Sequence, residues 1–157
     1  MKKICILLPG LLLFISFCFA QEVIRVQPCK DTLIQRQADS VKSVFSKQGY
    51  SVLREASITM ESEYEMPVVV QLQERGLYQV VFIGDITSKM YEVRMYDWSE
   101  KMVAYQKKMW GDVDGNIISY VYQPKFTEFH MIKPVQVNKQ KKKGLCGYIM
   151  LLQKVKA

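Results

Sequence analysis

Residues 67–108 read PVVVQLQERGLYQVVFIGDITSKMYEVRMYDWSEKMVAYQKK. Short apolar-rich runs are separated there by short polar turns. In one run, Tyr91, Val93 and Met95 share one predicted face, and Glu92 and Arg94 share the other. Such a period of two is typical of β-strands that bury one face. The stretch therefore predicts an antiparallel sheet.

The same pattern continues on both sides of this stretch. We expect Gly76 and Asp114-Gly115 to form hairpin turns, and Val103 and Tyr105 to face the core. Short strands with frequent turns are typical of sandwiches and barrels. The predicted fold class is therefore mainly β: an antiparallel jelly-roll-like β-sandwich of seven to eight strands. The predicted strands are 51–59, 68–72, 77–83, 90–98, 101–109, 117–122, 126–137 and 145–153.

One N-terminal amphipathic helix is predicted over residues 31–48, packed on the sandwich. Thr32 and Gln35 match a capping box at its start, and Gly49 provides a C-terminal stop. Apolar residues recur at helical spacing on one face: Ile34, Ala38, Val41 and Phe45.

Residues 1–20 resemble a secretory signal peptide. Lys2 and Lys3 precede an apolar run that ends at Ala20, so cleavage is expected before Gln21. Two alternatives stay open: a retained membrane anchor, and lipid attachment at Cys18. We expect export to the periplasm or cell surface, a single domain over residues 21–157, and no transmembrane segment after signal removal.

Composition and cysteine usage fit an exported globular domain. Hydrophobic residues make up 49% of the chain, and the net charge is +7. Loss of Lys2 and Lys3 leaves 20 basic and 15 acidic residues, a net charge of +5 that suits either an anionic partner or ordinary solubility. Cys29 and Cys146 are expected to form a disulfide, with two buried thiols as the alternative.

Three short motifs resemble one known family. They are a strand that begins at Pro67, then Gly76-Leu77-Tyr78, then a strand that ends Met95-Tyr96-Asp97. Across residues 67–108 the chain resembles the pre-peptidase C-terminal type of bacterial β-sandwich. The resemblance implies a jelly-roll-like sandwich with a non-catalytic accessory role, and it identifies no site. The N-terminal helix, the two cysteines and the lack of an attached protease depart from that family.

Few residues suit catalysis. His130, the single histidine, lies in a predicted strand, where we expect a half-exposed position and no role as a base. Cys146 would need a free thiol to act as a nucleophile. A carboxylate-based hydrolase would need two acids held about 5–10 Å apart in a cleft. The available acids are Glu61, Glu63, Glu65, Asp85, Glu92, Asp97 and Glu100, and the sequence places no pair of them together.

Binding candidates are easier to find. Trp98 and Trp110 lie near strand ends, where we expect partial exposure; the other aromatic candidates are Tyr96, Tyr105, Tyr120 and Tyr122. The lysine loop, residues 139–143, is either a docking site or a solvated turn that guards a sheet edge, and its candidate residues are Lys141, Lys142 and Lys143. A weak metal candidate consists of Asp112, Asp114 and Asn116, although the same residues build tight turns.

These observations predict an exported, non-catalytic binding or interaction module of a bacterial cell envelope. Its expected partner is an envelope protein or a glycan, and no cofactor is predicted. Nucleic acid is excluded as a partner because the protein is expected to be exported. Two alternatives remain: a small carboxylate-based hydrolase, and a structural subunit or homo-oligomer that assembles through sheet edges.

Overall fold

The computed structural model describes residues 28–113 and 115–155. The predicted signal peptide, including Cys18, and the metal candidate Asp114 lie outside the described residues. No described helix is long and apolar enough to cross a membrane. The described elements are α1 (Thr32–Lys47), β1 (Tyr50–Met60), β2 (Val68–Leu72), β3 (Tyr78–Gly84), β4 (Met90–Tyr96), β5 (Met102–Met109), β6 (Ile117–Tyr122), β7 (Glu128–Val137) and β8 (Leu145–Lys154).

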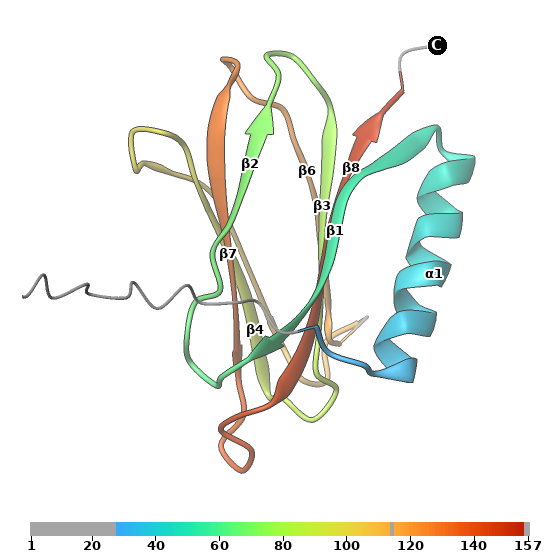
Figure 1. Ribbon diagram of the computed structural model, residues 1–157, viewed down its shortest axis with the longest axis vertical. Coiled ribbons are helices and arrows are strands. Elements are labelled where there is room, and N and C mark those ends of the chain that lie inside the picture. The colour runs from blue at the N-terminus through green and yellow to red at the C-terminus, as the bar shows by residue number, and fades with distance from the viewer. Residues whose placement is uncertain (1–27, 114, 156–157) are drawn as a thin grey trace, which may run out of the picture.

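The strands form two antiparallel four-stranded sheets that pack face to face (Figure 1). One sheet has the order β1-β8-β3-β6, and the other has the order β2-β7-β4-β5. We call the first the helix-covered sheet and the second the open sheet, because α1 packs on the outer face of the first (Figure 1). Two sheets with this interleaved order form a jelly roll, so the predicted fold class is confirmed.

Among the strands that the structure describes, only β4 and β5 are consecutive and pair as a hairpin within one sheet. The predicted hairpins at Gly76 and at Asp114-Gly115 are wrong, because β2 and β3 lie in opposite sheets and so do β5 and β6. A glycine turn reverses the chain whether or not the flanking strands pair. Gly76 is needed for a different reason: a Cβ there would lie 2.6 Å from the ring of Tyr78.

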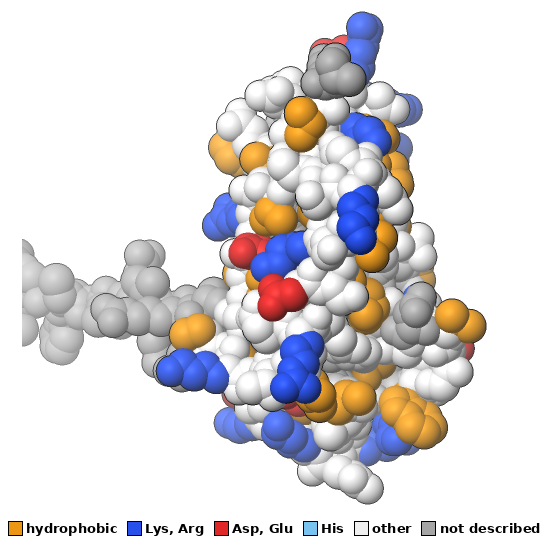
Figure 2. All heavy atoms as spheres, turned by 90° about the vertical axis from the view of Figure 1, so that its right-hand side faces the viewer, with side chains coloured by type: hydrophobic (Ala, Val, Ile, Leu, Met, Phe, Trp, Pro, Cys, Tyr) orange, Lys and Arg blue, Asp and Glu red, His pale blue; other side chains and the backbone are white. Residues whose placement is uncertain are grey.

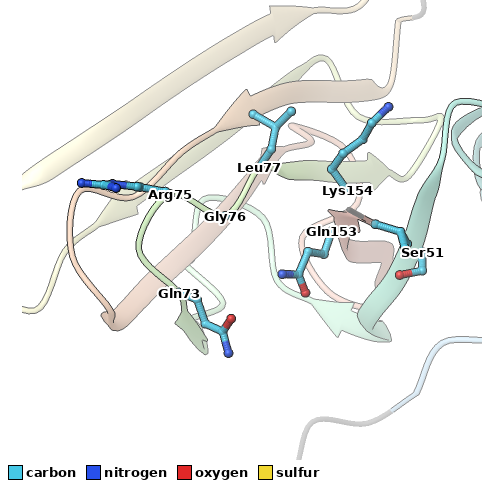
Figure 3. Close-up of a pocket in the computed structure, with 8 residues that line it drawn as sticks. Ser51, Gln73, Arg75, Gly76, Leu77, Gln153 and Lys154 are labelled. Atoms are coloured by element: carbon cyan, nitrogen blue, oxygen red, sulfur yellow. The ribbon is translucent and has the colours of Figure 1, made fainter. Parts of the chain in front are cut away.

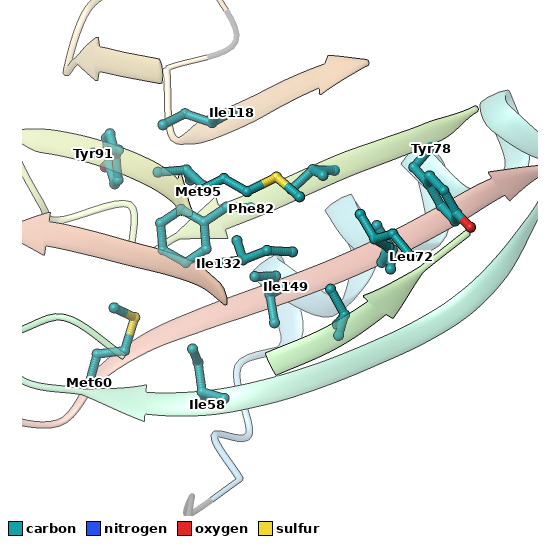
Figure 4. Close-up of a cluster of buried hydrophobic side chains, with 14 of the residues drawn as sticks. Ile58, Met60, Leu72, Tyr78, Phe82, Tyr91, Met95, Ile118, Ile132 and Ile149 are labelled. Carbon is teal, nitrogen blue, oxygen red and sulfur yellow. The ribbon is translucent and has the colours of Figure 1, made fainter. Parts of the chain in front are cut away.

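The main core lies between the two sheets (Figure 4). Tyr91, Val93 and Met95 of β4 are fully buried there, as their alternation predicted. Strands β3 and β8 are buried on both faces, because α1 covers the face that points away from the main core. The residues labelled in Figure 4 are Ile58, Met60, Leu72, Tyr78, Phe82, Tyr91, Met95, Ile118, Ile132 and Ile149.

The predicted inward position of Tyr105 is wrong. Val103 packs against the main core as expected. It also forms a β-bulge: Met95 pairs with Ala104 and Tyr96 pairs with Met102, which leaves Val103 without a partner on β4. The extra residue shifts the alternation of β5, so Tyr105 lies on the outer face.

The helix packs on β8 and β3 through its predicted apolar stripe. Ile34 and Ala38 are buried in a second apolar cluster under α1. The predicted N-cap is wrong by one residue: the carboxylate of Asp31 accepts hydrogen bonds from the N–H groups of Leu33 (2.8 Å) and Ile34 (3.0 Å). Thr32 is thus the first helical residue. Gly49, with φ of +78°, follows the C-terminus as expected.

Cys29 and Cys146 form the predicted disulfide, which joins the segment before α1 to β8. The amide of Cys29 also donates a hydrogen bond of 3.1 Å to Ser57 Oγ on β1. The chain before the helix is therefore fixed at two points on the helix-covered sheet.

A buried group of polar side chains, which we call the polar clamp, holds the β3–β4 connection against β8. Asp85 Oδ2 accepts a hydrogen bond from the N–H of Cys146 (3.2 Å), and Asp85 Oδ1 accepts one from Thr87 Oγ1 (2.6 Å). Gln136 Oε1 accepts hydrogen bonds from the N–H of Asp85 (2.8 Å) and from Ser88 Oγ (3.0 Å). Burial opposes ionisation of Asp85, but these donors and a nearby lysine lower its pKa below the ordinary value.

We predict that the disulfide makes a large contribution to stability. It closes a loop across 117 residues, for which loop-closure entropy is worth about 4–5 kcal/mol, less any strain. Urea unfolding with and without reductant should show a clearly lower midpoint for the reduced protein. The protein should also show no free thiol from these two residues before reduction. Equal midpoints would contradict the prediction.

The polar clamp predicts a specific loss of stability in acid. The folded-state pKa of Asp85 is below the unfolded value of about 3.9, so its ionised form stabilises the fold above that pH. This contribution is lost as the pH falls through the folded-state pKa. The variant Asp85→Asn should be less stable at pH 7, and its free energy of unfolding should depend less on pH below about 4 than that of the wild type. Denaturant titrations at several pH values measure both, and parallel pH profiles would contradict the role of Asp85.

Candidate functional site

The outer face of the open sheet is the best candidate for a binding surface. We call it the open face. The corresponding face of the helix-covered sheet lies under α1, whereas no helix of the described chain packs on the open face (Figure 1). An uncovered sheet face with large exposed apolar side chains is a typical interaction surface.

An ordered charge network occupies the centre of the open face. The guanidinium of Arg94 lies 2.9 Å from Glu65 Oε1 and 2.7 Å from Glu92 Oε2. Lys133 Nζ lies 2.9 Å from Glu65, and Lys107 Nζ lies 3.7 Å from Glu92. The hydrogen bond from Lys133 lowers the pKa of Glu65. The hydrogen bond that Arg94 donates to Glu92 raises the pKa of Arg94. The charges largely compensate one another, and each side chain is held by at least one partner.

The network also holds an aromatic side chain in place. The hydroxyl of Tyr105 lies 3.2 Å from Glu92 Oε1. Burial and this hydrogen bond raise the pKa of Tyr105. The ring of Tyr105, on the outer face of the edge strand β5, is partly exposed beside the charges.

One end of the open face is aromatic, and we call it the aromatic end. Trp98, just after β4, is 71% exposed, and its ring lies 5.9 Å from that of Phe129 on β7, which is 45% exposed. Tyr96 lies beside them, with Lys133 Nζ 5.0 Å from the centre of its ring. Val69 of β2 adds an exposed apolar side chain. The exposure predicted for Trp98 is confirmed.

Trp110 is also exposed, at 59%, but it lies at the opposite end of the sandwich from Trp98. It follows β5, whereas Trp98 precedes it, so the two residues are separated by the eight residues of β5, a length of roughly 25 Å. Lys89 Nζ lies 4.2 Å from the centre of the Trp110 ring. The two tryptophans therefore cannot belong to one small platform.

The lysine loop lies at the same end as Trp110, and its candidate residues are paired with acids. Lys142 lies 3.3 Å from Glu63, and Lys143 lies 3.6 Å from Glu61. Lys141 lies 3.5 Å from the buried carboxylate of Asp85 in the polar clamp. Pairing with these acids offsets much of the positive field that an anionic partner would sense.

Basic side chains elsewhere form no continuous patch on the side that carries α1. Figure 2 shows this side: Lys and Arg side chains are spread over it, separated by apolar and a few acidic side chains. A surface of this kind supports solubility and does not single out a binding site.

Two residues of the weak metal candidate, Asp112 and Asn116, are described by the structure. Asp112 Oδ2 accepts a hydrogen bond from the N–H of Met109 (2.7 Å), as expected of a tight turn. Asn116 is buried, and its side-chain amide donates to Gln37 on α1 and to the carbonyl of Gly84. Asp112 and Asn116 thus serve different structural contacts. Residues 28–113 and 115–155 contain no group of three His, Cys, Asp or Glu side chains suited to a metal.

His130 is fully buried, so the expected half-exposed position is wrong. Its Nε2 lies 3.1 Å from the hydroxyl of Tyr122, and its Nδ1 lies 3.3 Å from the carbonyl oxygen of Glu128. Because β7 presents His130 to the inside of the sandwich, it acts as a core residue with satisfied polar atoms. Cys146 is in the disulfide and has no free thiol.

A shallow groove at one end of the sandwich was not predicted from the sequence, and has a volume of about 410 Å³. Figure 3 shows that Arg75 and Lys154 point away from each other. Arg75 pairs with Glu74, and Lys154 Nζ donates to the carbonyl of Gln48. These cations do not converge on the groove, so we assign no ligand to it. Its lining residues are Ser51, Gln73, Arg75, Gly76, Leu77, Gln153, Lys154 and Val155.

Comparison with known proteins finds only a distant structural likeness. No protein-family model and no curated protein matches the sequence. One matching solved structure is the Glycosylation Associate Protein (Gap123) complex from Streptococcus agalactiae, with a TM-score of 0.35 and 9% sequence identity. The match covers 67% of this chain and 39% of that chain.

The pairing of the lysine loop predicts unequal effects of its lysines on stability. Lys142→Ala and Lys143→Ala remove solvated pairs, so each should change the free energy of unfolding by less than about 0.5 kcal/mol. Lys141→Ala removes a partner of a buried carboxylate and should cost about 1 kcal/mol. Lys139→Ala, at a lysine in none of these pairs, is the control. Chemical denaturation measures all four variants, and an equal effect of Lys141→Ala and Lys143→Ala would contradict the prediction.

Proposed function

We propose that the protein is an exported, non-catalytic binding module of a bacterial cell envelope, and that its open face binds envelope glycan. The proposal rests on one observation: the exposed rings of Trp98 and Phe129 lie next to a charge network whose side chains are held in place. The signal-like residues 1–20 and the disulfide support export. The resemblance of residues 67–108 to bacterial accessory sandwiches points in the same direction.

The chemistry of the open face suits a sugar better than a strongly charged ligand. Sugar rings have apolar faces that pack on aromatic rings, and hydroxyl groups that need donors and acceptors. The aromatic end supplies the rings, and Arg94, Glu65 and Lys133 supply polar groups nearby. The network holds three cations and two carboxylates, so most of its charge is offset and the face does not favour a highly charged ligand. Side chains already fixed by partners lose less entropy on binding.

The same network argues for binding over hydrolysis. Glu65 and Glu92 both contact Arg94, at 2.9 Å and 2.7 Å, so neither carboxylate is free to approach a glycosidic oxygen as a lone acid. The pKa of Glu65 is lowered, mainly by the hydrogen bond from Lys133, whereas a general acid in glycoside hydrolysis needs a raised pKa. The acids of the open face are therefore better suited to orient a ligand than to protonate one.

We predict that binding depends on Trp98 and not on Trp110. Trp98→Ala should weaken co-sedimentation with insoluble peptidoglycan or envelope polysaccharide by about tenfold, because it removes the most exposed ring of the aromatic end. Phe129→Ala should weaken it as well.

The matched control is Trp110→Ala, which removes an equally large exposed ring at the opposite end of the sandwich and should leave binding unchanged. Circular dichroism spectra should show that all variants fold. Equal losses in the Trp98 and Trp110 variants, or no retention of the wild type by any envelope glycan, would overturn the proposal.

A further inference from the structure

The sandwich has four edge strands, and they differ in how they are protected from pairing with another chain. The edges are β1 and β6 in the helix-covered sheet, and β2 and β5 in the open sheet. An edge strand presents backbone N–H and C=O groups that can pair with a further strand. Proteins usually block such pairing with charges, proline, bulges or short strand length.

The β1 and β2 edges are blocked together. Strand β1 carries Arg54 and Glu55 and has a register shift between Val52 and Arg54. The guanidinium of Arg54 donates a hydrogen bond of 2.7 Å to the carbonyl of Val69 on β2. Strand β2 is only five residues long and follows Pro67. Neither edge is free for a long new strand.

The β5 edge is blocked by charge and by irregular geometry. Lys107 and Lys108 are adjacent in this strand, and Lys101 directly precedes it. The bulge at Val103 interrupts its pairing surface. Positive charges on an edge strand are a common protection against strand addition.

Strand β6 has no charge, proline or bulge, and it is one residue longer than β2. Its sequence is Ile-Ile-Ser-Tyr-Val-Tyr, without charge, proline or glycine, and its register with β3 is continuous over all six residues. Residues of this type favour strands strongly. Ser119 is exposed and Val121 is 56% exposed, while Ile118 is buried in the core. The described residues thus leave this edge accessible.

We propose that β6 pairs antiparallel with β6 of a second copy of this chain, so that the two helix-covered sheets become one continuous eight-stranded sheet. Self-pairing places each strand opposite its own sequence, and a charged strand would therefore face like charge. The chain has a surplus of basic residues, so an uncharged edge is where two copies meet with least repulsion. Centred on Ser119, the pairing sets Val121 opposite Ile117 of the second copy, an apolar pair on one face.

The pairing has a definite geometry. Two identical antiparallel strands in one sheet are related by a two-fold axis perpendicular to that sheet, which makes the interface isologous and closed. Both copies of α1 then lie on one side of the extended sheet. Both open faces lie on the other side and point in the same direction.

The proposal can be tested by sedimentation equilibrium and light scattering. The sample is the protein purified after expression of its full sequence. The wild type should have twice the mass of the monomer at micromolar concentration. Val121→Lys should raise the dissociation constant of the dimer at least about tenfold, because it removes the apolar Val121–Ile117 contact twice per dimer and adds two positive charges to the interface. Val52→Lys, at an exposed valine of the protected edge β1, should leave the dimer intact.

Further results separate the proposal from other assemblies. Amide hydrogen exchange in β6 should slow as protein concentration rises, and Ser119→Lys should dissociate the dimer as Val121→Lys does. Circular dichroism should confirm that the lysine variants fold. A monomeric wild type, an oligomer larger than a dimer, or a Val121→Lys variant that still dimerises would each overturn the proposal, because one chain offers a single β6 edge.

Discussion

The fold depends above all on the placement of β8 between β1 and β3. This last strand is buried on both faces: one face contributes to the main core, and the other lies under α1 with the disulfide at Cys146. Strand β8 pairs with β1 and β3, which lie far before it in the sequence. The helix-covered sheet is therefore complete only when this last strand has been inserted. Such non-local pairing costs loop-closure entropy. The disulfide between Cys29 and β8, and the polar clamp that binds the start of β8, both act where that cost is greatest.

The two outer faces of the sandwich follow from the same constraint. Because α1 covers β3 and β8, these strands are mostly apolar: β3 has no charged residue, and β8 has none before Lys154. Strand β4 lies in the open sheet and alternates instead, so Glu92 and Arg94 reach the outer face. Glu92 is nonetheless buried there and Arg94 is only partly exposed, so both charges need partners, which they find in each other and in Glu65. The exposed rings of the aromatic end are not required by the fold, which is why they are informative about function.

Local patterns predicted the elements well, and they failed wherever the answer depended on distant residues. Alternation located β4, helical spacing located α1, and the expectation of export together with two cysteines predicted the disulfide. Turn chemistry could not show that the strands flanking Gly76 lie in opposite sheets, because a turn encodes chain reversal and not sheet membership. The same limit applies to the candidate site. Exposure of Trp98 and Trp110 was predictable near strand ends, but their separation along β5 and the pairing of Lys142 with Glu63 depend on topology.

Two exposed surfaces of the jelly roll, the aromatic end and the β6 edge, are not needed for packing of the sandwich. The aromatic end lies on the open sheet, and the unprotected β6 edge lies on the helix-covered sheet, so a chain can use both at once. A single exposed ring pair offers little area, and one such contact binds a sugar weakly. Two open faces that point in the same direction would engage a polymer with repeated units together, and the second contact would then benefit from a high effective concentration. Pairing at β6 would therefore convert a weak site on each chain into a stronger attachment without adding any contact to the site itself.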